Sequence, residues 1–280
     1  MGLAVLRSRA LAGLAAPAVT VEVHLANGLP AFTIVGLAEA EVRESRDRVR
    51  AAIHNSGFDF PAGRVTVNLA PADLPKESGR YDLPIALGIL AASGQLPTDE
   101  LDQYEFAGEL SLSGALRPVR ASLAMSYAIQ QMGDSQRAFI LPKANAAEAA
   151  LVSNANIYPA ESLLQVCAHF ASKDPAARLT KNLSSPIPSR GDYPDFSEVK
   201  GQHYARRAME IAAAGGHSVL MVGPPGSGKS MLANRLPGLL PPMSDLESLE
   251  TAAIQSLSGN FLIEHWGRRP FRAPHHTAAS

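Results

Sequence analysis

The chain has 280 residues, 46% of them apolar, which suits one large or two ordinary domains with buried cores. Its 25 Lys and Arg residues nearly balance its 26 Asp and Glu residues, so no overall basic excess indicates nucleic-acid binding. The single cysteine, Cys167, excludes a disulfide within the chain and suits a reducing cytoplasm. No apolar block is long enough to span a bilayer, and strand-like alternation begins too early for a cleaved signal. We therefore expect a cytoplasmic protein without a membrane segment.

The first 170 residues predict a mixed α/β domain. Apolar and polar residues alternate as in half-buried strands, or follow a turn as a strand would, over 19–25, 31–35 and 65–69. Helices are expected over 39–56, with a solvated charged face, and over 83–93, with Asp82 as the cap. The later elements alternate between strand and helix: short strands over 106–114, a helix over 121–132, a strand over 137–141, a helix over 143–151, a strand over 155–158 and a helix over 161–170. Such alternation predicts crossover units on a sheet.

The composition changes after residue 170. Four prolines interrupt a polar stretch over 171–195, which makes it the best candidate for a linker. A second domain is expected over 196–280. Its predicted elements are a helix over 203–214, a strand over 219–222, a helix over 231–236 and a further helix opened by the capping box Ser244-Asp-Leu-Glu247.

A phosphate-binding motif follows the apolar run 219–222. The motif G-x-x-x-x-G-K-[ST] is matched by Gly223, Pro224, Pro225, Gly226, Ser227, Gly228, Lys229 and Ser230. The glycines let backbone N–H groups turn toward a triphosphate, Lys229 can reach its β- and γ-phosphates, and Ser230 can ligate Mg²⁺. We find no guanine-reading Asn-Lys-x-Asp, so the sequence favours ATP over GTP.

Several longer segments resemble one known family. Phe196-Ser-Glu-Val-Lys-Gly-Gln202, the helix-like Ala205 to His217, the phosphate loop and Phe271-Arg-Ala-Pro-His-His-Thr277 are similar to the magnesium-chelatase branch of AAA+ ATPases, and within it to the ComM/YifB subfamily. Asn68-Leu-Ala-Pro-Ala-Asp-Leu-Pro-Lys76 and Arg80-Tyr-Asp-Leu-Pro-Ile-Ala-Leu87 resemble the N-terminal domain of that subfamily. The resemblance implies an N-terminal Lon-protease-like domain of the ribosomal S5 domain 2 type over 1–170, followed by part of a P-loop AAA+ α/β domain.

The resemblance also implies a function. It predicts a homo-oligomeric, hexameric ATPase motor that uses ATP and Mg²⁺ and acts on DNA, with branch migration during natural transformation as the associated role. It assigns Lys229 as the catalytic residue and, beside the phosphate loop, places Val199 and Gly201 against adenine. No Walker B acid, sensor or arginine finger is recognisable before Ser280, so we expect this chain alone to bind nucleotide weakly and to hydrolyse it poorly. A protein-remodelling ATPase and a non-catalytic nucleotide-binding scaffold remain as alternatives.

Lon proteases use a Ser–Lys dyad, and the matching positions here fall near Tyr81 or Asp82 and near Leu123. None of these residues can perform that chemistry, which argues for an assembly or partner-binding domain rather than a protease.

Two further groups near the end of the chain allow more than one interpretation. His275 and His276 are adjacent and lack further ligands at metal-binding spacing, so a family structural or DNA-contacting loop is favoured over a zinc site. A basic cluster beside Trp266 and Phe271 suits either nucleic-acid contacts or a solvated loop that packs one aromatic ring inward; its members are Arg268, Arg269 and Arg272.

Overall fold

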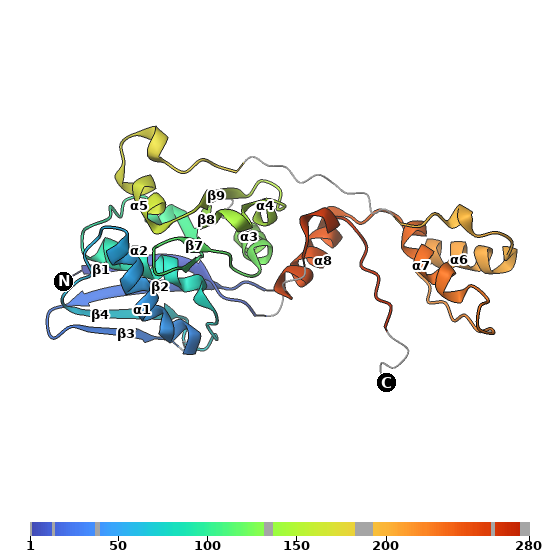
Figure 1. Ribbon diagram of the computed structural model, residues 1–280, viewed down its shortest axis with the longest axis horizontal. Helices are drawn as coiled ribbons and strands as arrows, with labels where there is room; N and C mark the ends of the chain where they lie inside the picture. Colours follow the sequence, from blue (N-terminus) through green and yellow to red (C-terminus); the bar gives the residue numbers. More distant parts are fainter. Residues whose placement is uncertain are drawn as a thin grey trace. The chain divides into compact units, whose positions relative to one another are not determined.

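The computed structural model describes residues 2–12, 15–36, 40–131, 137–182, 193–258 and 261–274. The chain forms two compact units, one over Met1–Pro186 and Ala253–Phe261 and the other over Ile187–Ala252 and Leu262–Ser280 (Figure 1). The first unit contains both helices and strands, and three of its strands form a parallel sheet. The predicted mixed α/β fold class is therefore confirmed. None of the described helices has both the length and the apolar character needed to cross a membrane.

A four-stranded sheet opens the first unit. Its strands, in spatial order, are β1 (Gly2–Arg9), β2 (Ala18–Ala26), β4 (Arg64–Ala70) and β3 (Ala31–Val35). Neighbouring strands are antiparallel except β3 and β4, which are parallel. In β4 the alternation predicted from sequence is present, because Val65, Val67 and Leu69 are fully buried whereas Thr66 and Asn68 lie half-buried on the opposite face. The three strands predicted here are confirmed.

The edge strand β1 has no counterpart among the predicted elements. Leu6 is fully buried, but Leu3 and Val5, on the other face of the sheet, are 66% and 50% exposed. Apolar residues on both faces remove the period-2 alternation by which a half-buried strand is recognised. The strand therefore had no readable sequence pattern.

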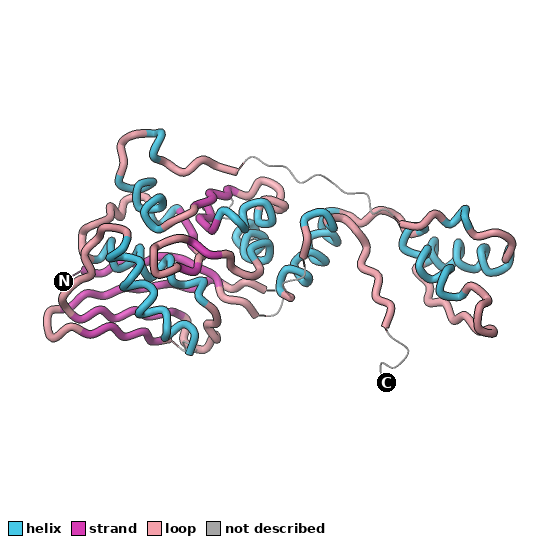
Figure 2. The backbone as a smooth tube through the Cα atoms, in the orientation of Figure 1, coloured by secondary structure: helices cyan, strands magenta, loops and turns pink. Residues whose placement is uncertain are grey.

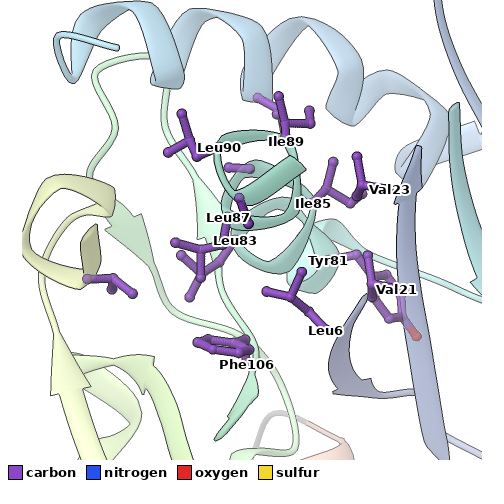
Figure 3. Packing of buried hydrophobic residues seen from close by; sticks show 14 of the residues in the cluster. Leu6, Val21, Val23, Tyr81, Leu83, Ile85, Leu87, Ile89, Leu90 and Phe106 are labelled. Carbon is purple, nitrogen blue, oxygen red and sulfur yellow. The ribbon is translucent and has the colours of Figure 1, made fainter. Parts of the chain in front are cut away.

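Helix α2 (Asp82–Ala92) is the centre of the main hydrophobic core. It is apolar around its whole circumference, as expected of a helix without a solvent-facing side. It packs against β1 and β2 and also contacts α1 (Ala40–Asn55) and α5 (Leu163–Ala171). Figure 3 shows side chains of the two strands, among them Leu6, Val21 and Val23, lying against it. At Gly88 a Cβ atom would lie 2.5 Å from Val23 Cγ2, so the glycine permits the close approach of helix and sheet.

Asp82 does not cap α2 as predicted. It is the first residue of the helix, and no side chain caps the helix at Tyr81. The fully buried carboxylate instead accepts hydrogen bonds from Arg48 Nε (2.9 Å), Arg48 Nη2 (3.2 Å) and the backbone N–H of Leu110 (3.1 Å). Burial raises the pKa of Asp82 to about 6, against the effect of Arg48. Arg48 therefore pairs with a buried carboxylate and does not belong to the solvated charged face predicted for α1.

A second, parallel sheet has the strand order β5 (Tyr104–Phe106), β8 (Ala138–Pro142) and β9 (Asn156–Ala160). The helices that alternate with these strands are α3 (Ser122–Gln131), α4 (Ala146–Ala149) and α5. The helix predicted over 143–151 is shorter than expected, since a 3-10 turn, Lys143–Asn145, precedes the single turn of α4. A small hairpin joins β6 (Glu109–Leu110) and β7 (Leu116–Arg117). Further 3-10 turns lie at Gly79–Tyr81, Leu101–Gln103 and Pro175–Ala177.

A buried ion-pair network connects β1 to β5. Glu105 Oε2 lies 2.6 Å from Arg9 Nε, and its Oε1 lies 2.8 Å from Arg9 Nη2 and 3.2 Å from Arg137 Nη1. Arg9 and Glu105 are 2% and 1% exposed, and Arg9 also donates to the carbonyl of Ala16 (3.0 Å). Two arginines therefore share the carboxylate of Glu105, and both Arg9 and Glu105 are nearly closed to water.

The first part of the predicted linker packs against the first unit. Leu179 is buried, and the backbone N–H of Asn182 donates to the carbonyl of Ile157 in β9 (2.8 Å). The backbone N–H of Leu179 donates to His169 Nδ1 (3.0 Å), so the other ring nitrogen, Nε2, carries the proton that faces Tyr104 Oη (2.9 Å). His169 is thereby fixed as a neutral tautomer. Cys167, two residues earlier in α5, is buried, which confirms a core role, and burial raises the pKa of its thiol to about 12.

Acidification is expected to loosen this attachment of Leu179. Burial, with Arg178 as a second cause, lowers the pKa of His169, while Glu100 opposes this shift. The unfolded chain therefore takes up a proton more readily than the folded chain, so the stabilisation is complete above about pH 6.5 and is lost as pH falls toward the folded-state value. In a His169→Gln variant we expect the free energy of unfolding to vary less between pH 7.5 and 5.5 than in the unmodified chain, measured by urea denaturation. An equal pH dependence in both proteins would contradict this role.

The second unit holds α6 (His203–Gly215), α7 (Lys229–Leu239) and the start of α8 (Asp245–Leu257), with 3-10 turns at Phe196–Glu198 and Ile263–His265. The capping box at α8 is confirmed, because Glu247 Oε2 accepts from the Ser244 N–H (2.7 Å) and Ser244 Oγ accepts from the Glu247 N–H (3.2 Å). The strand predicted over 219–222 is wrong. Its Leu220 and Val222 are 89% and 88% exposed, and Figure 2 shows loop where a strand was expected. No described residue of the second unit forms a strand with which this run could pair.

Candidate nucleotide-binding site

The phosphate loop leads directly into helix α7. Lys229 is the first helical residue, and Gly228 precedes it in the left-handed conformation, with φ of 85°. Gly226 also has a positive φ, 77°, which other residues rarely adopt. The first N–H groups of a helix lack intrahelical acceptors, so such a terminus favours an anion. The glycines at 226 and 228 thus shape a turn in front of an anion-attracting helix end.

Lys229 folds back over this turn. Its Nζ donates to the carbonyls of Gly223 (2.8 Å) and Pro224 (2.9 Å) and to Ser227 Oγ (3.3 Å). The ammonium group is therefore held inside the loop, where phosphate oxygens can replace carbonyl oxygens as its acceptors. Ser230, next in the helix, is exposed, so its hydroxyl is accessible to a ligand or a metal ion.

A pocket of about 380 Å³ adjoins the loop. Its lining combines polar loop groups with apolar side chains of α6, α7 and the run 219–222: Gln202, Ala205, Ala208, Met209, Val219, Leu220, Met221, Val222, Gly223, Pro224, Ser227, Lys229 and Leu232. An apolar wall beside a phosphate-binding turn is what a nucleotide requires, since its base is largely apolar and its phosphates are charged.

The two residues expected against adenine lie beside this pocket rather than in its lining. Val199 is fully buried in a small core with Phe196, Met209 and Leu232. Gly201 is exposed, with φ of 67°, just before the pocket residue Gln202. The family-like segment that predicted adenine contacts for Val199 and Gly201 therefore lies next to the pocket. Gln202 and Met209 line the pocket instead.

Comparison with known proteins matches both parts of the chain to one group. Residues 21–145 match the family model described as subunit ChlI of Mg-chelatase, and residues 195–280 match magnesium chelatase, subunit ChlI. The chain is 52% identical over its whole length to competence protein ComM of Haemophilus influenzae, and 49% and 48% identical to YifB proteins of Salmonella typhimurium and Escherichia coli. The chain belongs to the ComM/YifB family of magnesium-chelatase-like AAA+ proteins. It covers 55% of the ComM protein and 54% of each YifB protein, so it spans about half the length of these relatives.

Within this ComM/YifB chain, Gln202 connects the pocket wall to the phosphate loop. It lies in the left-handed conformation (φ 49°) at the start of α6, and its Nε2 donates to the carbonyl of Ser227 (3.3 Å). No role for Gln202 was predicted from the sequence, in which it ends the family-like segment Phe196–Gln202 directly after Gly201. The contact places Gln202 to hold the loop against the first turn of α6.

Replacing Gln202 with alanine is expected to weaken nucleotide binding about 2- to 12-fold, because one neutral hydrogen bond contributes about 0.5–1.5 kcal/mol. Titration calorimetry with a non-hydrolysable ATP analogue measures the change. The neighbouring His203→Ala serves as the matched control, since His203 is exposed and lies outside the pocket lining. Equal affinities for the two variants would contradict a loop-positioning role for Gln202.

The positions that match the Lon dyad contain no dyad in this family member. Tyr81 and Leu123 are buried, at 1% and 0% exposure, and Asp82 is paired with Arg48. Lys76 is also buried, and its Nζ donates to the carbonyl of Pro71. The described residues therefore provide no lysine placed to activate a hydroxyl at these positions.

The basic cluster of the second unit is partly used for internal contacts. Arg269 Nε and Nη2 donate to the carbonyl of Pro241 (3.1 and 2.9 Å), and the Arg268 guanidinium lies 5.7 Å from the ring centre of Tyr193. Trp266 is 7% exposed, which matches the interpretation of a loop that packs one aromatic inward, whereas Phe271 is 46% exposed. His275 and His276 lie outside the described residues. Among the residues that are described, no three His, Cys, Asp or Glu side chains gather as metal ligands would.

Proposed function

We propose that this chain carries the ATP-binding part of an AAA+ motor ATPase. The observation that supports this most directly is Lys229, whose ammonium group lies inside a glycine turn at the start of α7. Its three hydrogen bonds to the loop hold the ammonium group at the turn, where it can donate to a phosphate. The adjoining pocket has the size and the mixed lining that a nucleotide needs.

Each residue of the site has its own proposed role in binding ATP and Mg²⁺. The backbone of Gly223 to Gly228 would surround the phosphates, and Lys229 would neutralise the β- and γ-phosphates. Ser230 would ligate Mg²⁺, which supplies charge neutralisation at the transferred phosphoryl group when it is bound. Lys229 is the residue we propose as catalytic, because it is the cation of this loop that can contact the reacting phosphate. Gly201 and the buried Val199 lie outside the pocket lining and would position the neighbouring residues that contact adenine.

We further infer that the intact protein works as a hexamer on DNA. In AAA+ hexamers nucleotide sites lie between subunits, so a neighbouring copy would complete the site proposed here. One relative is named a competence protein, a role that concerns incoming DNA, which supports DNA rather than another substrate. Branch migration during natural transformation is the activity we propose for the whole protein.

The ATPase rate of the intact protein, with and without forked or four-way-junction DNA, tests this proposal. We expect ATP turnover that DNA stimulates and that the Lys229→Ala variant lacks. Turnover that ignores DNA but increases with a protein partner would replace the DNA motor by a protein-remodelling ATPase. Normal cellular function of the Lys229→Ala protein, together with retained assembly, would instead indicate a nucleotide-binding scaffold.

A further inference from the structure

Arg80 is a buried cation without a carboxylate partner among the described residues. It is 3% exposed and lies in the 3-10 turn that precedes α2. Its Nε donates to Ser78 Oγ (3.0 Å) and weakly to the carbonyl of Glu77 (3.4 Å), and its Nη1 lies 3.8 Å from Met125 Sδ. None of these contacts involves Nη2. A hydroxyl, a carbonyl and a thioether do not neutralise a guanidinium, and a buried charge left in this way costs several kcal/mol.

The electrostatic surroundings do not resolve the imbalance. The exposed Glu77 supports the charge of Arg80, and the exposed Arg120 opposes it with a smaller effect, but burial outweighs both. Burial is the main reason that the pKa of Arg80 is lowered, and Arg120 adds to the effect. The contrast with Arg9, which has a buried carboxylate at 2.6 Å, shows how this chain neutralises an internal arginine elsewhere.

A second observation comes from α3. Ser122, its first residue, is fully buried, and its Oγ has no hydrogen-bond partner within the described part of the chain. Ser122 and Met125 are three residues apart and so share a helix face, and Met125 is the residue that contacts Arg80. The amide of the next residue, Leu123, already donates to Glu148 (3.3 Å), so the helix terminus itself is not the feature of interest.

The backbone is strained close to Arg80 in one segment and close to Ser122 in the other. Ser78 has φ of 65° and Ala121 has φ of 61°, a conformation that is unfavourable for residues other than glycine. Such strain persists where surrounding structure requires it and is frequent at ligand sites. The two strained residues flank Arg80 on one segment and Ser122 on the other.

We propose that Arg80 and Ser122 form a binding site for an oxyanion, either a carboxylate or a phosphate group, with Arg120 at its entrance. The guanidinium supplies charge and two-pronged donation, and the hydroxyl of Ser122 supplies a further donor. The site lies wholly within the first unit and is independent of the nucleotide proposal.

Thermal denaturation of the 280-residue chain tests this site. The Lys229→Ala variant serves as the parent, so that the phosphate loop does not contribute. Inorganic phosphate and acetate are added separately at constant ionic strength, and the anion that raises the midpoint identifies the group. At about ten times Kd we expect a rise of about 3–6 °C. Adding Arg80→Met should abolish this rise, and should raise the midpoint in anion-poor buffer because an uncompensated charge is removed.

The matched control is Arg117→Ala in the same parent, since Arg117 is an exposed arginine paired with Glu109. It should keep the full response to the anion. The proposal is overturned if neither anion shifts the midpoint, or if the shift survives Arg80→Met. Should Arg80→Met fail to fold, Ser122→Ala decides: it removes only an unpartnered hydroxyl, and a response weakened several-fold supports the site, whereas an unchanged response overturns it.

Discussion

Replacing Lys229 with alanine is expected to weaken ATP binding about 30- to 1,000-fold, corresponding to about 2–4 kcal/mol for charge-assisted bonds to phosphate. Among the described residues, the lysine donates hydrogen bonds only to loop atoms, namely the carbonyls of Gly223 and Pro224 and the hydroxyl of Ser227. These neutral acceptors lie at the surface and can be exchanged for phosphate oxygens at little cost. The variant therefore loses an attraction specific to the bound state.

Titration of both proteins with a fluorescent ATP analogue and Mg²⁺ measures the effect. Arg207→Ala is the matched control, because Arg207 is an exposed cation of the same unit that pairs only with Glu210 (3.2 Å) among the described residues. It should bind nucleotide with unchanged affinity, and both variants should keep the helical content of the unmodified chain. If Lys229→Ala binds as tightly as Arg207→Ala, the loop is not a phosphate site.

The phosphate loop was readable from sequence because its chemistry fixes residue types at fixed positions. Glycine is needed where φ is positive, as at Gly226 and Gly228, and a lysine must follow at the helix start. Gln202 carried no comparable signal. Glutamine suits many positions, and its role depends on a left-handed backbone and on a contact with Ser227 that is 25 residues away in sequence. The pairing of Arg48 with Asp82 was hidden for the same reason.

Regular elements of the fold were predictable where one face is buried and the other is wet, as in β4. The strand β1 was not, since Leu3 and Val5 make its outer face apolar as well. The apolar run 219–222 is the opposite case, because a strand was predicted there and does not form. Its residues suit a strand, but strand formation requires a neighbouring strand, which no described residue provides. The local sequence therefore indicated a tendency to form a strand, but the described residues offer no strand with which this run could form hydrogen bonds.

Replacing Glu105 with alanine is expected to destabilise the first unit by about 3–5 kcal/mol, the usual effect of removing one partner from a buried ion pair. The loss exceeds that of a hydrogen bond because Arg9 would keep its charge in a site that is 2% exposed, with Arg137 close by. Urea denaturation of the chain measures the change. Replacing Arg9 by methionine together with Glu105→Leu should recover part of the loss, since the pair is then removed rather than broken.

The surface pair Lys143–Glu161 is the control that separates burial from distance. Its Nζ and Oε1 atoms are 2.5 Å apart, against 2.6 Å for Arg9 and Glu105, but the two side chains are 69% and 63% exposed. Water and salt screen exposed charges, so Glu161→Gln should leave the denaturation midpoint nearly unchanged. If the two variants lose similar stability, contact distance would govern these pairs. A large loss confined to Glu105→Ala would show that the burial of the charges governs the cost, which is the same physical reasoning that singles out Arg80.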